Sequence, residues 1–289
     1  MKSNQALWSK QLQTSPPDFG KAKFLPRWLF KLIYKKRQVR NKPIILDSKI
    51  NPTFIKDKIS IVILSCKRLK ELQRLIDTLK EYFSKIKPKV DLEIILVDNG
   101  SGSDLINWAK KEVFFDKIIA NKKNLGMAVA LKEAYEKTNG EYILLIEDDF
   151  IIDYEKPFLE ICIEIFNEFY DIGIIRLKNQ RNWGKRYRLI GPKRSTSNGT
   201  NFWTWIPSFN GKLNVWCAGS VMFRKVSLTS SGEIPIGPNF PRTNKMHQGV
   251  LYEEEFGKQY NKNWLAAKIE DCYPFIQPND NAESPGWGD

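Results

Sequence analysis

Residues 141–152 read EYILLIEDDFII, an apolar run that ends in three adjacent carboxylates, Glu147, Asp148 and Asp149. The apolar part has the length and composition of a buried strand. Because burying an unpaired charge is costly, the carboxylates at its end need a metal ion, a basic partner or a solvent-filled cleft. Residues 141–152 therefore supply both a strand of the predicted fold and the carboxylates of the predicted site.

Outward from this stretch, the chain alternates short apolar runs with amphipathic helical patterns. The pattern predicts strands at 59–65, 91–99, 116–121 and 141–149, and helices at 70–86, 103–113 and 127–139. Strict alternation of this kind predicts an α/β fold with a mostly parallel central sheet flanked by helices. Ligands of such sheets bind at the carboxyl ends of the strands, where the polar residues of this sequence collect.

After residue 150 the alternation weakens. We expect a helix at 155–170, a strand at 172–177, a strand with its turn at 215–225 and a final helix at 253–268. These elements extend the same sheet, so residues 58–289 are predicted to form one domain. Its two halves are residues 58–150 and 151–289.

The net charge of +13 is concentrated in residues 1–57, which hold 13 lysines and arginines against 3 acidic residues. Within this basic extension, residues 21–40 have the pattern of an amphipathic helix with one apolar and one cationic face. Three interpretations remain open: a strap that packs on the protein's own body, a helix on an anionic membrane surface, or a contact with nucleic-acid phosphates.

Composition excludes several classes of protein. No apolar stretch approaches the roughly 20 residues that span a bilayer, and the N-terminus lacks the apolar core of a secretory signal. We expect a cytoplasmic protein, with residues 21–40 as the candidate for peripheral attachment to the membrane. The four cysteines lack metal-ligand spacing, and the segment after the first strand, SCKRLKE, lacks the glycine pattern of a dinucleotide fold or P-loop.

The acidic triplet suits a hard divalent cation. Oxygen ligands with open positions favour Mg²⁺ or Mn²⁺ bridging phosphate oxygens, and a diphosphate leaving group needs that charge neutralised. A solvated acidic strand end, or a set of N-terminal caps for the next segment, would have the same sequence pattern. Asp98, in LVDNGSGSD, is placed to accept hydrogen bonds from a ribose or base, or to cap the next helix.

Together, ISIVILSCKR, LEIILVDNGSGSD and NKKNLGMAVALKEAYEKTNGEYILLIEDDF resemble the nucleotide-sugar-binding half of a GT-A-fold, family-2-like glycosyltransferase. The resemblance covers residues 59–150 and includes a DXD-like motif. It implies a nucleotide-sugar site at positions near strand ends: Ser65, Arg68, Asp98, Gly126 and Asp148. It also implies that Asp149 ligates the metal and that Glu147 assists it. Cys66 and Lys67 depart from the family pattern.

The resemblance also implies a catalytic base and an acceptor wall. An inverting transferase needs a carboxylate that deprotonates the acceptor hydroxyl, and LYEEEFGKQYNKNWLAAK resembles the late helix that carries it. The base is then Glu253, with Glu254 as its nearest rival; an acidic helix start favoured by the helix dipole has the same sequence. In NVWCAGSVMFRK, Trp216 and Gly219 are placed to shape the acceptor side.

These observations predict a metal-dependent, inverting hexosyltransferase that uses a nucleotide-diphosphate sugar, with UDP favoured, and a glycan or lipid-linked acceptor. Two alternatives remain: transfer to modified DNA bases, and a non-catalytic nucleic-acid- or membrane-binding protein with a degenerate transferase fold. The enzymatic interpretation carries a condition. Carboxylates that face bulk water away from any pocket, or that are clamped by the chain's own arginines and lysines, would overturn it.

Overall fold

The structure is a computed structural model that describes residues 53–178, 190–205, 219–236 and 255–278. The predicted basic helix at 21–40 lies outside these residues. Trp216, Glu253 and Glu254 lie outside them as well.

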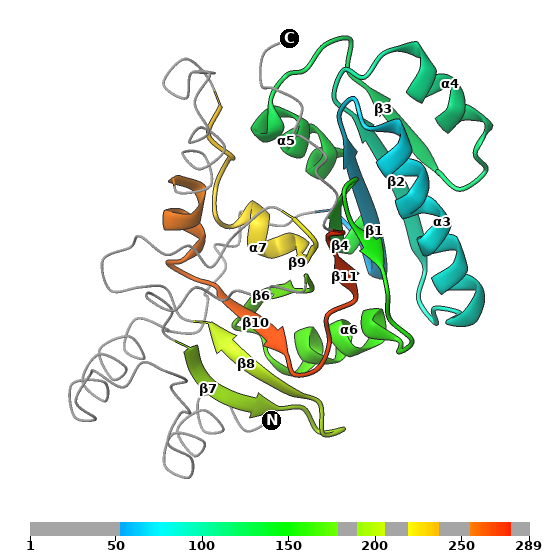
Figure 1. Ribbon diagram of the computed structural model, residues 1–289. Helices are drawn as coiled ribbons and strands as arrows, with labels where there is room; N and C mark the ends of the chain where they lie inside the picture. The colour runs from blue at the N-terminus through cyan, green and yellow to red at the C-terminus, as the bar shows by residue number, and fades with distance from the viewer. Residues whose placement is uncertain (1–52, 179–189, 206–218, 237–254, 279–289) are drawn as a thin grey trace.

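A nine-stranded sheet with the order β3-β2-β1-β4-β9-β6-β10-β8-β7 forms the centre of the fold (Figure 1). Its first four strands are β3 (Lys117–Ala120), β2 (Leu92–Asp98), β1 (Ile55–Ser65) and β4 (Gly140–Glu147). Neighbours among these four are all parallel. The parallel sheet predicted from the strand and helix alternation is therefore present in the first half of the domain.

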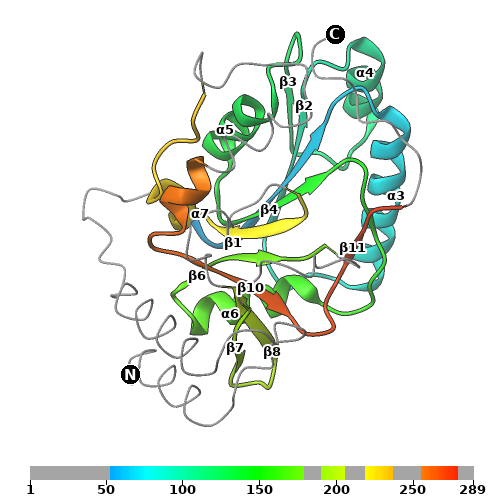
Figure 2. The same cartoon turned by 60° about the vertical axis from the view of Figure 1, so that its left-hand side comes forward.

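Both faces of the parallel part are covered by helices. One face packs against α3 (Leu69–Lys85), α4 (Ser103–Lys111) and α6 (Phe158–Glu168), and the other packs against α5 (Met127–Lys137) (Figures 1 and 2). Strand β1 shows how the sequence allows this, because Ile61 and Ile63 belong to the first core and Val62 to the second. An uninterrupted apolar run is the pattern of a strand buried on both faces.

The second half of the sheet mixes strand directions. Strand β9 (Val221–Arg224) runs antiparallel to both β4 and β6 (Ile172–Arg176), and it leads directly into α7 (Lys225–Thr229). Strand β10 (Leu265–Ile269) is parallel to β6 and antiparallel to β8 (Asn201–Trp205). Strand β7 (Ile190–Ser195) pairs with β8 at the edge.

The prediction of one helix over residues 253–268 is wrong in its second part. Residues 255–260 are helical, but residues 265–269 form β10, whose five residues are all buried. Alanine and leucine favour helix in isolation, yet these residues lie between β6 and β8 and form ladders with both. Tertiary pairing outweighs the intrinsic preference. Strands β7 and β8 fall in a stretch whose polar and aromatic content predicted no element.

A separate two-stranded sheet brings residues 275–276 back to the segment that follows the acidic triplet. Strand β11 (Phe275–Ile276) pairs antiparallel with β5 (Ile151–Ile152), which begins two residues after Asp149. This pairing brings Gln277 beside Asp149. Among the described helices, none has the length and apolar content needed to cross a membrane.

Candidate functional site

Strand register brings the predicted site residues together. Ser65 is paired with Asp98 across β1 and β2, and Leu64 is paired with Glu147 across β1 and β4. The three strands are parallel, so their carboxyl ends open at the same edge of the sheet. The polar segments that follow these strands therefore share one site.

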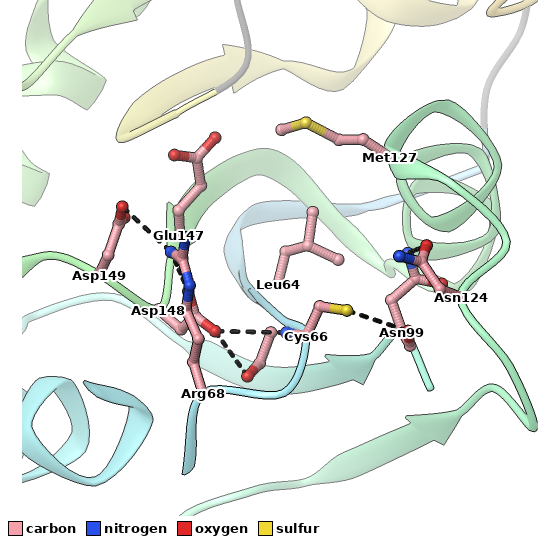
Figure 3. Close-up of a pocket in the computed structure, with 10 residues that line it drawn as sticks. Leu64, Cys66, Arg68, Asn99, Asn124, Met127, Glu147, Asp148 and Asp149 are labelled. Atoms are coloured by element: carbon pink, nitrogen blue, oxygen red, sulfur yellow. Dashed lines mark hydrogen bonds and ion pairs between the residues drawn. The ribbon is translucent and has the colours of Figure 1, made fainter. Parts of the chain in front are cut away.

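A cavity of about 190 Å³ occupies this edge (Figure 3). Its lining residues come from the ends of β1, β2 and β4, the start of α5 and the loop before it: Leu64, Ser65, Cys66, Arg68, Asn99, Asn124, Met127, Glu147, Asp148 and Asp149. Five of the predicted site residues are among them, namely Ser65, Arg68, Glu147, Asp148 and Asp149.

Among the carboxylates that line the cavity, Asp148 is the most deeply buried, with 4% of the residue exposed. Its Oδ2 accepts hydrogen bonds from Ser65 Oγ at 2.7 Å and from the Cys66 backbone N–H at 3.3 Å. Burial raises the pKa of Asp148 to about 6, although the Ser65 bond and the Arg68 charge act in the opposite direction. The pocket thus holds a carboxylate that is costly to charge and that is fixed in place by β1.

Arg68 lies between the two aspartates. Its Nη1 is 3.3 Å from Asp148 Oδ1 and 3.2 Å from Asp149 Oδ2, and Figure 3 shows the guanidinium joining the two carboxylates. Asp149 Oδ2 also accepts a hydrogen bond from Gln277 Nε2 at 2.8 Å. The arrangement that would speak against an enzyme, carboxylates clamped by the chain's own cations, is therefore present in part, because Arg68 pairs with two of the three carboxylates in the ligand-free state.

Two buried atoms in this group have no hydrogen-bond partner: Asp149 Oδ1 and Arg68 Nε. They have opposite polarity, since the first requires a cation or donor and the second requires an acceptor. Buried polar atoms are nearly always paired. An unpartnered acceptor and an unpartnered donor in one cavity therefore fit a site that receives both a cation and an anion.

The fit to a divalent metal rests on these atoms. Within the described ranges, no three carboxylate, thiol or imidazole side chains converge to hold a metal ion. Mg²⁺ commonly takes only one or two protein carboxylates and completes its shell with substrate phosphates and water. Asp149, with its unpartnered Oδ1, is compatible with that incomplete kind of site.

Asp98 is buried behind the residues that line the cavity. Both of its carboxylate oxygens accept the Ser101 backbone N–H at 3.1 Å, and burial raises the pKa of Asp98. It does not line the cavity, whereas its neighbour Asn99 does. In the ligand-free state Asp98 therefore holds the turn after β2.

An asparagine pair forms the wall opposite the aspartates. Asn99 Nδ2 donates to Asn124 Oδ1 at 3.0 Å, and Asn124 Oδ1 also accepts the Gly126 backbone N–H at 2.9 Å. Gly126 has φ of +84° and immediately precedes α5. It shapes this wall without lining the cavity. Gly100, with φ of +87°, packs so closely that a Cβ would lie 2.4 Å from the backbone nitrogen of Asn124.

Glu147 projects to the other side of the cavity from Asp148, toward Met127 (Figure 3). This follows from the alternation of side chains along a strand. Gly219, just before β9, faces it, since a Cβ at this glycine would lie 3.4 Å from Glu147 Oε1. Gly219 has φ of +91°, so the backbone conformation favours glycine here, whereas a Cβ would make only an ordinary contact with Glu147.

The turn after β1 departs from ordinary geometry. Lys67 is a non-glycine residue with φ of +57°, and its backbone N–H donates to Ser101 Oγ at 2.6 Å. The Cys66 thiol lines the cavity and lies 3.3 Å from the Asn99 carbonyl oxygen, to which it donates. Burial, followed by the charge of Asp98, raises the pKa of Cys66.

The predicted base is not placed by the described residues. Of the three adjacent glutamates, only Glu255 is described; it forms an ion pair with Lys258 within the helical turn. The predicted acceptor wall is represented only by Gly219.

Sequence reasoning missed several lining and supporting residues. Asn99 and Asn124 stand in polar clusters that the sequence places at strand ends, so only their individual roles were missed. Gln277 had no such signal, because it is 128 positions from Asp149 and reaches it only through the pairing of β11 with β5.

Comparisons with solved structures support the fold. TarS residues 1–349 from S. aureus in complex with UDP-GlcNAc is 15% identical, with a TM-score of 0.52, over 76% of this chain and 58% of that chain. A mannosyltransferase, PcManGT from Pyrobaculum calidifontis, in complex with GDP-Man and Mn²⁺, is 13% identical, with a TM-score of 0.52, over 89% of this chain and 66% of that chain. The match covers 36% of a longer TarS chain, so this chain spans less than two thirds of these proteins.

A search of curated proteins found no match. The family model described as glycosyl transferase family 2 matches residues 60–227, which is more than half of the chain. The match begins in β1 and ends in α7, so it contains every residue that lines the cavity. The family resemblance and the GT-A fold predicted from the sequence are both confirmed, and the chain belongs to glycosyl transferase family 2.

Proposed function

We propose that this chain transfers a sugar from a nucleotide-diphosphate sugar to an acceptor hydroxyl, with a divalent cation and with inversion at the anomeric carbon. One observation carries the proposal: a family 2 fold opens a cavity at the carboxyl ends of β1, β2 and β4, in which Asp149 Oδ1 and Arg68 Nε are buried without partners. An unpartnered acceptor beside an unpartnered donor matches the two charges of a metal diphosphate.

The residues that line the cavity would bind different parts of the donor, according to their chemistry. Arg68 supplies a planar cation suited to phosphate oxygens. Asp149 would hold Mn²⁺ or Mg²⁺, which when bound would stabilise the charge of the departing diphosphate. Asp148, held by Ser65 and the backbone of Cys66, is placed to accept hydrogen bonds from ribose or sugar hydroxyls.

The asparagine wall and Asp98 serve the nucleotide. Asn99 and Asn124 line the cavity and carry both donors and acceptors, which suits a base edge or a ribose. Asp98 does not line the cavity in the ligand-free state, so it would bind a ligand hydroxyl or amine only once the turn after β2 opens and its bonds to Ser101 are given up. UDP is the favoured nucleotide, supported by the UDP-GlcNAc complex of TarS, and GDP is the rival, supported by the GDP-Man complex of PcManGT.

The acceptor side is assigned by the resemblance. Glu253, or else Glu254, would remove the acceptor proton as the hydroxyl attacks, and Trp216 with Gly219 would shape the acceptor wall. Gly219 leaves space over Glu147, which is the side of the cavity away from Arg68. We assign the acceptor to the glycan or lipid-linked class, with residues 21–40 as an attachment to anionic membranes.

Release of nucleotide tests the proposal directly. The full chain is incubated with UDP- and GDP-sugars and Mn²⁺, and free nucleotide is measured with and without EDTA. We expect release from at least one donor, its loss with EDTA, and its loss in Asp149→Asn. Asp153→Asn is the matched control, because Asp153 is an exposed acidic residue just past β5 and should leave release unchanged.

Absence of metal-dependent release from every donor would refute the proposed transfer and favour a non-catalytic binding protein. Anionic vesicles and duplex DNA then separate the membrane and nucleic-acid alternatives. Vesicle binding that fades with salt supports the first, and a retained duplex complex with a steep salt dependence supports the second.

A further inference from the structure

A single arginine forms ion pairs with two carboxylates in the cavity. Arg68, Asp148 and Asp149 have side chains that are 14%, 5% and 17% exposed, so water screens their charges only weakly. Removing the cation from such a group would leave buried negative charge uncompensated, which is strongly unfavourable. In the ligand-free protein, Arg68 therefore performs the neutralising role that the sequence assigns to a metal.

Arg68 and a divalent metal compete for the same carboxylate. Arg68 Nη1 lies 3.2 Å from Asp149 Oδ2, so a metal held by the same carboxylate would be close to the positive charge of the guanidinium. Two neighbouring cations repel strongly where water is scarce. Metal binding to Asp149 in the absence of other anions must therefore work against Arg68.

A diphosphate resolves the conflict. Arg68 Nε is buried without a partner, so the guanidinium has a donor to offer to a phosphate oxygen. Turning toward the phosphate would release Asp149 Oδ2 from Arg68 while the hydrogen bond from Gln277 Nε2 at 2.8 Å continues to fix that oxygen. The metal then meets an oriented carboxylate without a competing cation.

We propose that Arg68 is a built-in counter-ion that makes metal binding conditional on the nucleotide diphosphate. Without donor, Arg68 pairs with one oxygen of each aspartate and keeps the metal out. With donor, the diphosphate draws Arg68 away and admits the metal. The inference rests on the proposed function, and it assigns Arg68 a role that a fixed structural clamp would not have.

The test is Mn²⁺ binding to the full chain without nucleotide, followed by the electron paramagnetic resonance signal of free Mn²⁺. In Arg68→Gln the competing charge is gone, so Mn²⁺ should bind about tenfold or more tightly than in the wild type, the size of effect that one adjacent charge has on an ionic equilibrium. Arg68→Lys, which keeps a cation, should remain close to the wild type. Lys80→Gln is the control, since Lys80 pairs with Glu112 away from the cavity.

The same variant separates this role from simple phosphate binding. Arg68→Gln should bind UDP or GDP more weakly while it binds Mn²⁺ alone more tightly, and a clamp that only holds the fold would weaken both. Unchanged or weaker Mn²⁺ binding in Arg68→Gln overturns the inference.

A wild-type measurement covers the case in which Arg68→Gln does not fold. Crystals soaked in Mn²⁺ alone should show Arg68 on both aspartates and no anomalous peak at Asp149. A Mn²⁺ peak at Asp149 with Arg68 still in place would overturn the inference. If nucleotide release proves metal-dependent and the Arg68 experiments fail, only the counter-ion role is lost; if no donor reacts or binds, the proposed function itself fails.

Discussion

Replacing Asp148 by asparagine should change how stability depends on pH. Burial raises the pKa of Asp148 from 3.8 to about 6 in the folded chain. Between these values the folded state binds more protons than the unfolded state, so this group makes stability fall as the pH rises. A shift of this size corresponds to about 3 kcal/mol at neutral pH.

Asparagine has nearly the same shape and no charge. In EDTA, Asp148→Asn should therefore lack this part of the pH dependence. The variant should gain stability relative to the wild type as the pH rises from 4 to 7, by up to about 3 kcal/mol, which is several degrees in melting temperature for a chain of this size. The gain comes with loss of activity, a trade-off typical of functional sites.

The assay is urea unfolding of both proteins at intervals between pH 4 and pH 8, with the difference in unfolding free energy plotted against pH. Comparison of the two proteins cancels the titration of all other groups that the substitution leaves unchanged. Parallel curves for wild type and variant, with a constant offset, would refute the assignment of a raised pKa to Asp148.

Three further outcomes follow from the geometry. Gly100→Ala places a side chain at φ of +87° against backbone, so it should destabilise the fold by about 1–3 kcal/mol and weaken nucleotide binding, as measured by thermal unfolding and calorimetry. Arg194 of β7 has a side chain that is 1% exposed, and it forms an ion pair with Asp171. Arg194→Ala should therefore lower the free energy of unfolding in urea by about 3–5 kcal/mol; a change below 1 kcal/mol would contradict this reading. Alkylation of Cys66, which lines the cavity, should slow when UDP and Mn²⁺ are bound, with the fully buried Cys162 as an unlabelled reference in peptide mass spectrometry; equal labelling with and without ligand would place the donor elsewhere.

The first half of the fold follows from local pattern. Strand β4 could be predicted because its apolar run is bounded by Gly140 and by the acidic triplet, and α3 because its apolar residues recur at helical spacing. The convergence of Ser65, Asp98 and Glu147 also follows, since parallel neighbouring strands must end at one edge.

The second half depends on contacts that are distant in sequence. Residues 265–269 contain good helix formers, and only pairing with β6 and β8 makes them a strand. The same limit applies within the site. The sequence motifs identified the three carboxylates and Arg68. They did not show that Arg68 would bridge two of the carboxylates or that Gln277 would fix one of them.

A crystal structure of the chain with UDP or GDP and Mn²⁺, with data collected at the manganese absorption edge, shows whether Asp149 and Arg68 receive a metal and a diphosphate together. We expect an anomalous peak about 2.1 Å from an Asp149 oxygen, the distance typical of Mg²⁺ and its oxygen ligands, and we expect Arg68 to contact the diphosphate. Nucleotide bound elsewhere, or bound while Arg68 still joins Asp148 to Asp149 with no metal at Asp149, would show that the proposed site is wrong.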